Sequence, residues 1–513
     1  MNIGGILAGN ARRHPDKECL IYGKLRYTYR EFNGYVNRMA NAMAGLGVCK
    51  GKKVALMMQN SDRYVLVFMA AMKLGAVAVP INFRLAAPEV EYILNHSDSV
   101  ILFFDPKYGE LIASLEGKIP GVRYLVRAGA GEQPQNAMEW DELMAGAAGE
   151  EPGVDVNECD DCEILYTSGT TGRPKGALFD HHRVIHVGIA IVVHMAVNPG
   201  DRLLHLAPLF HSAQLNLFLV SGMFVGATHV VMRAFEPRAV LETIQDEKIT
   251  LFFGVPAMYN FMLQVPDFDK YDLSSITRCG YGAAPMPVDL VRRALDRFPT
   301  DRFYNLCGLT EGGPGGVLLE PEDQLRKPGF GGKAIINTEA RVIDKSGCEV
   351  APGQVGEFII RSEMVMKGYY KDPGATAETL RDGWLYTGDL AIIDEEGYIT
   401  LVDRKKDMII TGGENVYSTE VEHVLHRHPG VLEAAVIGLP HPVWGETVTA
   451  VICPRPGAGL TTEEIRAFCA QHLADYKIPR IYKFTGPLPR NASGKVLKRI
   501  LRDIYSEIRR TGK

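Results

Sequence analysis

The chain has 513 residues, more than one ordinary domain holds, so the sequence predicts two or more domains. Hydrophobic residues make up 46% and charged residues 23%, as in globular proteins, and 56 basic against 61 acidic side chains leave a formal net charge of −5. That balance, without the signature of any folded nucleic-acid-binding module, argues against a nucleic-acid partner.

Cysteine usage and the N-terminal residues predict the compartment. Nine cysteines, an odd number at wide spacings, do not read as a disulfide framework, and Cys159 and Cys162 form a single isolated Cys-x-x-Cys pair. The first residues lack the basic and apolar regions of a signal peptide. An apolar run at 215–232 carries polar residues and is short for a membrane span. We expect a cytoplasmic protein without a transmembrane segment, and we leave open both peripheral membrane contact and a homodimer.

The first hundred or so residues alternate between two periodicities. Short apolar runs are followed by segments with helical spacing, which predicts parallel β-α-β units in a layered α/β domain. The predicted strands are 54–58, 76–80 and 100–104, and the predicted helices are 29–46, 62–74 and 87–95.

The stretch Tyr-Thr-Ser-Gly-Thr-Thr-Gly-Arg-Pro-Lys-Gly at 166–176 has the composition of a phosphate-binding loop. Its glycines can adopt backbone angles that other residues avoid, and consecutive free N–H groups in such a loop form an anion-binding concavity. Lys175 adds a mobile positive charge but is followed by Gly176, so the loop is not a Walker A sequence. The residues expected to contact phosphate are Thr167, Ser168, Gly169, Thr170, Thr171, Gly172 and Lys175.

This stretch closely resembles the phosphate loop of the acyl-activating, adenylate-forming (AMP-binding) enzymes, which include acyl-CoA synthetases, adenylation domains of nonribosomal peptide synthetases and beetle luciferases. Further motifs extend the resemblance over nearly the whole chain. It implies an α/β fold: a large N-terminal domain of layered α/β subdomains plus a small β subdomain, followed by a mobile small α+β C-terminal domain. We expect the large domain at 1–403, a hinge at 404–407 and the small domain at 408–513.

Two central motifs imply further site residues in the large domain. Pro-Leu-Phe-His at 208–211 resembles the mouth of the acyl and pantetheine tunnels, where His211 matches an aromatic residue that swings between the two half-reactions. The segment 280–285 resembles the one whose backbone flanks the adenine, which implies contacts from Gly282, Ala283 and Ala284.

Residues 304–311 resemble the family's Tyr-Gly-x-Thr-Glu motif. The resemblance implies a nucleotide contact from Asn305 and places Thr310 against the α-phosphate of ATP. It also implies that Glu311, together with Thr170, holds Mg²⁺, a hard cation that takes oxygen ligands and usually keeps waters.

The same motif departs from the family at one position. Cys307 stands where the family usually has an aromatic residue that packs on the adenine, and Tyr281 and Tyr304 are alternative candidates for that contact. The glycine-rich stretch at 312–316 has two interpretations, room beside the acyl group or a flexible turn.

The last third of the chain carries the motifs that the resemblance assigns to ribose binding and to domain rotation. Asp389 ends Trp-Leu-Tyr-Thr-Gly-Asp, and its carboxylate can accept two hydrogen bonds from vicinal hydroxyls. Arg404 matches a ribose or phosphate contact, and Lys406 matches the pivot of the hinge.

Two further motifs belong to the predicted small domain. Gly412 and Gly413 match a loop that lines the pantetheine tunnel, where glycine lets the backbone approach a thin substrate. Lys495 matches the mobile lysine that reaches the active site from the C-terminal loop.

These residue types suit the activation of a carboxylic acid. A carboxylate approaching the α-phosphate of ATP brings negative charge beside negative charge, which demands cations and donors where charge develops. We predict an AMP-forming acyl-CoA ligase that uses ATP, Mg²⁺ and coenzyme A on an apolar acid, a medium- or long-chain fatty acid or another apolar acid. The alternatives are an enzyme that loads a carrier protein, a light-emitting oxygenase and a non-catalytic nucleotide-binding scaffold.

Overall fold

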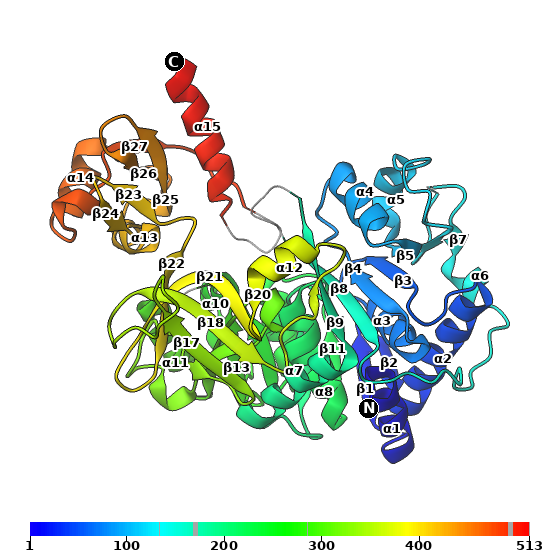
Figure 1. The fold of residues 1–513 in the computed structure, drawn as a ribbon. Helices are drawn as coiled ribbons and strands as arrows, with labels where there is room; N and C mark the ends of the chain where they lie inside the picture. Colours follow the sequence, from blue (N-terminus) through cyan, green and yellow to red (C-terminus); the bar gives the residue numbers. More distant parts are fainter. Residues whose placement is uncertain (133, 168–172, 285, 491–495, 512–513) are drawn as a thin grey trace. The chain divides into compact units, whose positions relative to one another are not determined.

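The computed structural model describes residues 1–132, 134–167, 173–284, 286–490 and 496–511. They fall into two compact units (Figure 1). The first unit comprises Met1–Ala340 and Ile360–Tyr386, and the second comprises Arg341–Ile359 and Thr387–Lys513. No helix within the described ranges is long and apolar enough to cross a membrane.

An eight-stranded sheet in the first unit carries the strands on both sides of the predicted phosphate loop. The strand order is β19-β9-β8-β4-β3-β5-β6-β7. The pairs from β8 to β7 are parallel, whereas β9 runs antiparallel to both β8 and β19. The strands are β3 (Lys53–Met57), β4 (Val77–Pro80), β5 (Ser99–Phe104), β6 (Tyr124–Arg127), β7 (Met138–Glu139), β8 (Asp161–Thr167), β9 (Lys175–Asp180) and β19 (Gly368–Tyr369).

A nine-stranded sheet forms the rest of the β structure wholly inside the first unit. Its order is β16-β15-β14-β13-β12-β10-β11-β1-β2, and it is parallel from β14 to β1. The strands are β1 (Glu18–Tyr22), β2 (Leu25–Thr28), β10 (Arg202–His205), β11 (Thr228–Val231), β12 (Leu251–Gly254), β13 (Arg278–Gly282), β14 (Phe303–Gly308), β15 (Gly316–Leu319) and β16 (Lys333–Ala334).

Helices fill the space between these two sheets and cover their outer faces. Successive residues of β3 point to opposite sides, so Val54 packs with the helices between the sheets and Ala55 packs with an outer helix layer. The helices between the sheets are α1 (Ile3–Arg13), α2 (Tyr29–Gly45), α3 (Asp62–Leu74), α7 (His181–His194), the π-helix η2 (Ala213–Val220) and α8 (Ser221–Val225). The outer helices are α4 (Ala87–His96), α5 (Gly109–Ala113), α9 (Pro237–Glu247), α10 (Pro256–Leu263) and α11 (Val288–Arg297).

A third sheet is formed by strands between residues 338 and 404. Its order is β17-β18-β21-β20, and β22 pairs with β21. The strands are β17 (Thr338–Ile343), β18 (Gly356–Ser362), β20 (Leu380–Arg381), β21 (Trp384–Ile393) and β22 (Ile399–Arg404), with helix α12 (Pro373–Thr379) before β20.

The second unit also contains a five-stranded sheet with helices on both faces. Alternation along β25 puts Val436 against α13 and α14, and Ile437 against α15. The strands are β23 (Ile409–Thr411), β24 (Glu414–Val416), β25 (Val431–His441), β26 (Gly445–Pro454) and β27 (Ile481–Phe484), and the helices are α13 (Ser418–His426), α14 (Thr462–Ala470) and α15 (Lys498–Thr511).

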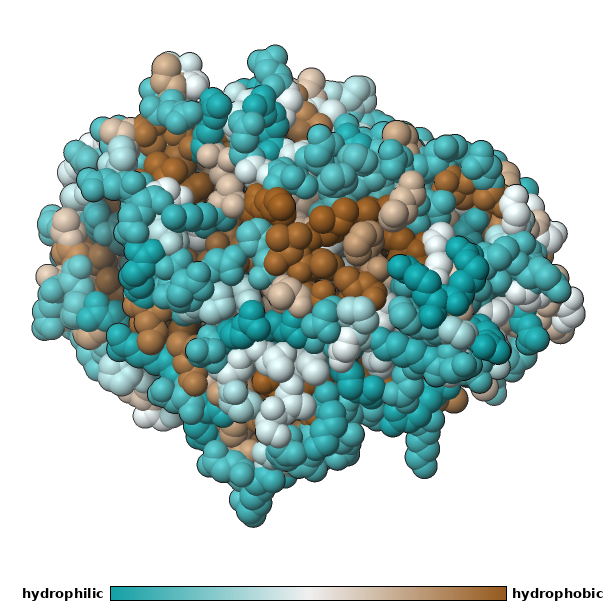
Figure 2. Space-filling view, turned by 90° about the horizontal axis from the view of Figure 1, so that it is seen from below, coloured by the Kyte–Doolittle hydropathy of each residue, from teal (hydrophilic) through white to brown (hydrophobic). Residues whose placement is uncertain are grey.

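The predicted fold class is confirmed, because layered α/β structure is followed by a small α+β unit. The apolar run at 215–232 is core, as in Leu215 and Phe218, which are 0% and 1% exposed. Apolar side chains also reach the surface, where Figure 2 shows them gathered in patches between hydrophilic ones on one face. All nine cysteines are free thiols.

Candidate active site

The two ends of the predicted phosphate loop are fixed by a β-ladder. Thr167, at the end of β8, lies opposite Lys175, at the start of β9, in antiparallel register. A sheet pair holds its facing residues close together, so the loop leaves and returns at neighbouring positions. Ser168, Gly169, Thr170, Thr171 and Gly172 lie outside the described residues.

The Glu311 carboxylate is the centre of the polar contacts beside this ladder. Its Oε1 accepts hydrogen bonds from the Thr167 hydroxyl at 3.3 Å and from the Tyr369 hydroxyl at 2.9 Å. The Lys175 Nζ lies 5.0 Å from the centroid of the Tyr369 ring. Burial and the Glu311 charge raise the pKa of Tyr369, so its hydroxyl stays protonated and can donate. The structure thus brings together three predicted residues, Thr167, Lys175 and Glu311.

Tyr369 is a site residue that the sequence did not reveal. It lies at the end of β19, which pairs with β9, and its partner Glu311 is 58 positions away in sequence. The only local sign is an aromatic pair after Gly368, which does not indicate a partner so distant in the chain.

Backbone packing holds Glu311 in place. Glu311 lies in the short 3₁₀ helix η4 (Thr310–Gly312), and its carbonyl accepts a hydrogen bond from the Met366 N–H at 2.9 Å. A Cβ on Gly313, whose φ is +83°, would lie 2.2 Å from the Met364 carbonyl oxygen. At Gly313, therefore, glycine lets two backbone segments pack closely and does not leave room for an acyl group.

His211 precedes the π-helix η2 and is joined to η4 through its neighbour. The Ser212 and Thr310 hydroxyls lie 3.5 Å apart. The His211 Nδ1 accepts a hydrogen bond from the Ala213 N–H at 3.3 Å, and burial lowers the pKa of the imidazole. His211 is therefore a neutral ring whose proton is on Nε2.

The predicted adenine segment follows the end of β13. A Cβ on Gly282 would lie 2.1 Å from the Leu306 carbonyl oxygen, so the strand requires glycine there. Ala283 has a φ of +64°, which a residue with a side chain rarely adopts and which is typical of functional sites. Ala284 is exposed beside it. On the neighbouring strand β14, the Asn305 Nδ2 donates to the Phe330 carbonyl at 2.9 Å.

Both alternative tyrosines are largely buried. Tyr281 is 3% exposed, and its hydroxyl donates to the Gln324 Oε1 at 2.7 Å. Tyr304 is 2% exposed and packs in the core between helix α7 and the sheet. Both side chains are therefore held by contacts within the fold, and their contact with adenine stays a prediction.

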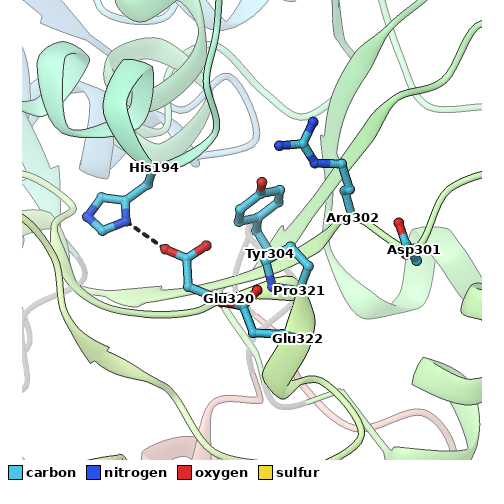
Figure 3. A pocket seen from close by; sticks show the side chains of 7 residues that line it. All are labelled: His194, Asp301, Arg302, Tyr304, Glu320, Pro321 and Glu322. Atoms are coloured by element: carbon cyan, nitrogen blue, oxygen red, sulfur yellow. Dashed lines mark hydrogen bonds and ion pairs between the residues drawn. The ribbon is translucent and has the colours of Figure 1, made fainter.

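A hollow of about 530 Å³ in the first unit is lined by Tyr304 but not by Glu311, Thr167 or Lys175. Figure 3 shows His194 pointing toward Glu320 at its edge, with Nδ1 and Oε1 2.8 Å apart. The other ring nitrogen accepts from the Ile336 N–H at 3.0 Å, so both nitrogens of His194 bind groups of the fold. The hollow is lined by His194, Asp301, Arg302, Tyr304, Glu320, Pro321 and Glu322, of which only Tyr304 was a candidate for a nucleotide contact.

In the second unit, the two predicted ribose contacts are neighbours. Asp389 on β21 lies opposite Arg404 on β22, and the Arg404 Nε is 2.9 Å from the Asp389 Oδ1. Thr387, two residues before Asp389, donates its hydroxyl to the Phe358 carbonyl at 2.6 Å and so fixes the strand.

The predicted hinge is a tight turn that follows β22. The Asp407 and Met408 N–H groups both donate to the Arg404 carbonyl, at 2.9 and 3.0 Å. Charged contacts surround the turn: Lys405 lies 2.8 Å from Glu357, and Arg502 lies 2.8 Å from Asp407. Burial lowers the pKa of Lys406.

Gly412 and Gly413 form the two-residue turn between β23 and β24. Their φ values of +61° and +88° match a type I′ hairpin, which favours glycine at both positions. A Cβ on Gly412 would lie 2.9 Å from the Trp444 ring, so this backbone also packs closely. Lys495 lies outside the described residues.

The described part of the chain contains no group of three or more His, Cys, Asp or Glu side chains that could hold a metal ion. Mg²⁺ does not require one, because it is usually bound by one or two carboxylates, waters and substrate phosphates. The hydrogen bonds described above use only Oε1 of Glu311. The second carboxylate oxygen of Glu311, beside the end of the predicted phosphate loop, is therefore a suitable ligand for such an ion.

Sequence comparison matches both parts of the chain to one family. The AMP-binding enzyme family matches residues 7–370, and the AMP-binding enzyme C-terminal domain matches residues 420–495. A feruloyl-CoA synthase from Amycolatopsis sp is 39% identical over 496 residues, 97% of each chain. The long-chain-fatty-acid–CoA ligase FadD13 of Mycobacterium tuberculosis is 38% identical over 514 residues, 98% of this chain and 99% of the relative.

Structural comparison agrees. The crystal structure of the anthranilate CoA ligase AuaEII in complex with anthranoyl-AMP superposes with a TM-score of 0.90 at 30% identity, covering 98% of this chain and 97% of that one. The chain therefore belongs to the AMP-binding, adenylate-forming enzyme family and is an acid–thiol ligase of the acyl-CoA synthetase type, which uses ATP and CoA.

Proposed function

We propose that this enzyme converts an apolar carboxylic acid first into an acyl-adenylate and then into its CoA thioester. The observation that carries the proposal is the cluster in which Glu311 accepts hydrogen bonds from Thr167 and Tyr369 beside Lys175. A carboxylate and a lysine held at the base of a phosphate loop suit the handling of a polyphosphate and its metal.

The first half-reaction joins two anions. The acid's oxygen attacks the α-phosphate, and pyrophosphate leaves, so the groups that matter are those that position the reactants and offset negative charge. Lys175 and Lys495 supply positive charge, and Thr310 donates to the α-phosphate. Mg²⁺ held by Glu311 and Thr170 would act as a Lewis acid on the phosphate oxygens.

The remaining nucleotide contacts follow the same proposal. Adenine lies against the backbone of the segment after β13 and beside Asn305, and the positive φ of Ala283 shapes that edge. The ribose is held by Asp389 and Arg404, which already pair at 2.9 Å. The proposed contacts of the phosphate loop, including Ser168, Gly169, Thr171 and Gly172, complete the set.

The second half-reaction requires a thiol to reach the acyl-adenylate. We propose that the small domain, 408–513, rotates about the turn at 404–407 relative to the large domain, 1–403, with Lys406 as the pivot. Rotation withdraws Lys495 and brings in the hairpin turn of Gly412 and Gly413. His211, neutral and beside the Ser212–Thr310 contact, is the aromatic residue that opens the way for the thiol.

We propose that the acyl group is apolar because the residues that follow His211 and the residues of β12 are mostly apolar. Phe218 and Phe253 stack with ring centroids 5.2 Å apart, and both are at most 3% exposed. The relatives are named for a feruloyl, a long-chain fatty and an anthranilate acid, so membership of the family does not fix the acid.

Coenzyme A is the proposed acceptor, in preference to a carrier protein. Phe83 packs edge-on against Phe210, the residue before His211, with ring centroids 5.3 Å apart. The charged ends of Arg84 and Lys107 lie 5.4 and 5.7 Å from the centroid of the Phe83 ring. Exposed cations beside the His211 segment would attract the phosphates of a nucleotide-bearing thiol. The proposed compartment is the cytoplasm, where CoA and free thiols coexist.

A panel of acids, aliphatic of increasing length and aromatic, tests the proposal through pyrophosphate release with and without CoA. We expect a single burst without CoA and continuous turnover with CoA, for apolar acids. Dephospho-CoA and pantetheine should show lower kcat/KM than CoA. Continuous turnover only with an acyl-carrier protein would favour the loading enzyme instead.

A further inference from the structure

A glutamate is buried in the strand that leads into the phosphate loop. Glu163 lies on β8, four residues before Thr167, and is 0% exposed. Alternation along a strand puts Glu163, Leu165 and Thr167 on one face, the face toward the helices between the two sheets. The carboxyl is therefore inside the core and shares a strand face with the hydroxyl that contacts Glu311.

One side chain binds this carboxyl. The Asn216 Nδ2 donates to the Glu163 Oε1 at 2.6 Å, and Asn216 is also 0% exposed. Asn216 belongs to the π-helix η2, which starts two residues after His211. π-helical turns are rare and are often found at functional sites. The hydrogen bond therefore joins the strand of the phosphate loop to the helix that follows the predicted aromatic gate.

Two oxygen atoms of this pair lack a hydrogen-bond partner among the described residues. They are the Glu163 Oε2 and the Asn216 Oδ1, and both are buried. The first is a carboxyl oxygen, which can donate only when it is protonated, and the second is an amide oxygen, which can only accept. A proton on Oε2, donated to Oδ1, would satisfy both atoms and close an acid–amide ring of two hydrogen bonds.

The surroundings favour that proton. Burial raises the pKa of Glu163 from 4.5 to about 7, and only the Asn216 hydrogen bond opposes the shift. The ionisable groups that interact with Glu163 are the Tyr64 hydroxyl on α3 and the Cys162 thiol on its own strand, and burial raises the pKa of each. Tyr64 donates to the Leu209 carbonyl at 3.1 Å. None of the described groups that interact with this carboxyl is basic.

We propose that Glu163 is a positioning residue that works as a neutral acid, donating to Asn216 and so fixing the π-helix against the phosphate-loop strand. The inference deepens the proposed function: the acid–amide ring sets the position of His211 and Ser212 relative to Thr310. An ionised Glu163 would lose its donor and leave a buried charge, so the π-helix would loosen from the strand.

Glu163→Gln is the decisive variant, because its amide donates to Asn216 and accepts from it but does not ionise. Glu163→Leu, which has similar volume and no hydrogen bonds, is the matched control. We expect the glutamine variant to keep the wild-type KM for the acid near neutral pH. The leucine variant should raise that KM about three- to tenfold, as the loss of one or two buried hydrogen bonds predicts, while the KM for ATP changes less.

Thermal unfolding between pH 5 and 8 tests, without any substrate, whether Glu163 is protonated in the native state. The native state keeps its proton up to about pH 7, whereas the unfolded chain releases it near pH 4.5, so the wild type loses stability over that interval. Glu163→Gln lacks this loss, so its Tm should gain on the wild type as the pH rises. Infrared difference spectra should show a protonated carboxyl band at pH 6 that is missing in the variant.

Either of two results would show that Glu163 is not protonated: no such band, or a Tm difference that does not change with pH. Equal KM values for the acid in the leucine and glutamine variants would leave no positioning role. Because the band and the Tm need no substrate, they can succeed even if the proposed acid–CoA reaction fails.

Discussion

The base of the phosphate loop and the turn at 404–407 are held by different kinds of contact. β8 lies between β4 and β9 in the eight-stranded sheet, and its Ile164 and Leu165 are 0% and 3% exposed. At the turn the contacts are ion pairs, and the Lys405 side chain is 60% exposed. One region is fixed by buried apolar strands, and the other by backbone hydrogen bonds and ion pairs, one of which includes the exposed Lys405.

The difference in energy decides what each region can do. Burying one large aliphatic side chain stabilises a fold by about 1.5–3 kcal/mol, whereas an exposed ion pair contributes about 0–1 kcal/mol. Contacts of the second kind can be broken and remade at little cost. We therefore assign phosphate and metal binding to the fixed region and the change between half-reactions to the turn.

The largest effect should come from Lys495→Ala. Removing a single group that stabilises transition-state charge typically costs about 10²- to 10³-fold in rate, and we expect adenylation from ATP to fall by at least that much. Thioester formation from supplied acyl-adenylate should survive, because the lysine has left the site by then. Single-turnover assays of each half-reaction measure both effects.

An equal loss of rate in both half-reactions of the Lys495→Ala variant would contradict the division of roles between the two regions. Lys495 would then serve the site in both steps, and a rotation that withdraws it would have no support.

Lys406→Pro should have the next largest effect, on the opposite half-reaction. Proline fixes φ near −65° and removes an N–H, so it should hold the turn in one conformation, the adenylating one. Acid-dependent pyrophosphate formation should continue at a substantial rate, while transfer to CoA falls about tenfold to a hundredfold or more.

Lys406→Ala is the control, because it keeps φ free and removes the charge. It should spare both steps. A folded proline variant that makes acyl-CoA normally would refute the pivot, and an alanine variant as damaging as proline would point to the charge.

Tyr369→Phe tests the fixed region with a smaller change. The variant removes the 2.9 Å hydrogen bond to Glu311 and keeps the ring beside Lys175. A hydrogen bond to a charged group is worth about 1.5–3 kcal/mol, so we expect the KM for Mg²⁺–ATP to rise about tenfold to a hundredfold. Isotope exchange between pyrophosphate and ATP at varied Mg²⁺ measures it.

Tyr370→Phe is the matched control on the next residue. Its hydroxyl donates to Asp98 at 2.8 Å, so the substitution also removes a hydrogen bond to a carboxylate, but not the one at Glu311. Similar losses of Mg²⁺ dependence in the two variants would show that the effect is not specific to Glu311.

Local features of the fold could be predicted, and non-local contacts could not. The helix expected at 62–74 is α3, Asp62–Leu74. It could be predicted because its apolar periodicity and its Ser61 cap lie within one short stretch of sequence. Thr167 and Lys175 were identified by composition. The Tyr369–Glu311 and Glu163–Asn216 contacts join segments that are 58 and 53 residues apart. No sequence pattern in these segments predicts which partner each one contacts. The Tyr281–Gln324 hydrogen bond likewise joins segments 43 residues apart.

The smallest effect concerns Cys307, in the fixed region. It lies on β14 opposite Val317 of β15, on the same strand face as Asn305. An aromatic ring stacked on another ring adds about 0.5–1.5 kcal/mol beyond the area it buries, so Cys307→Tyr should tighten ATP about two- to tenfold if the adenine lies there. Cys307→Leu, apolar without an aromatic ring, separates stacking from burial and should change affinity less. Calorimetric titration with a non-hydrolysable ATP analogue measures both. A large loss of affinity in the tyrosine variant, with normal unfolding, would show that this face of the sheet is already filled, and that the fixed region is complementary to the nucleotide without an aromatic residue at position 307.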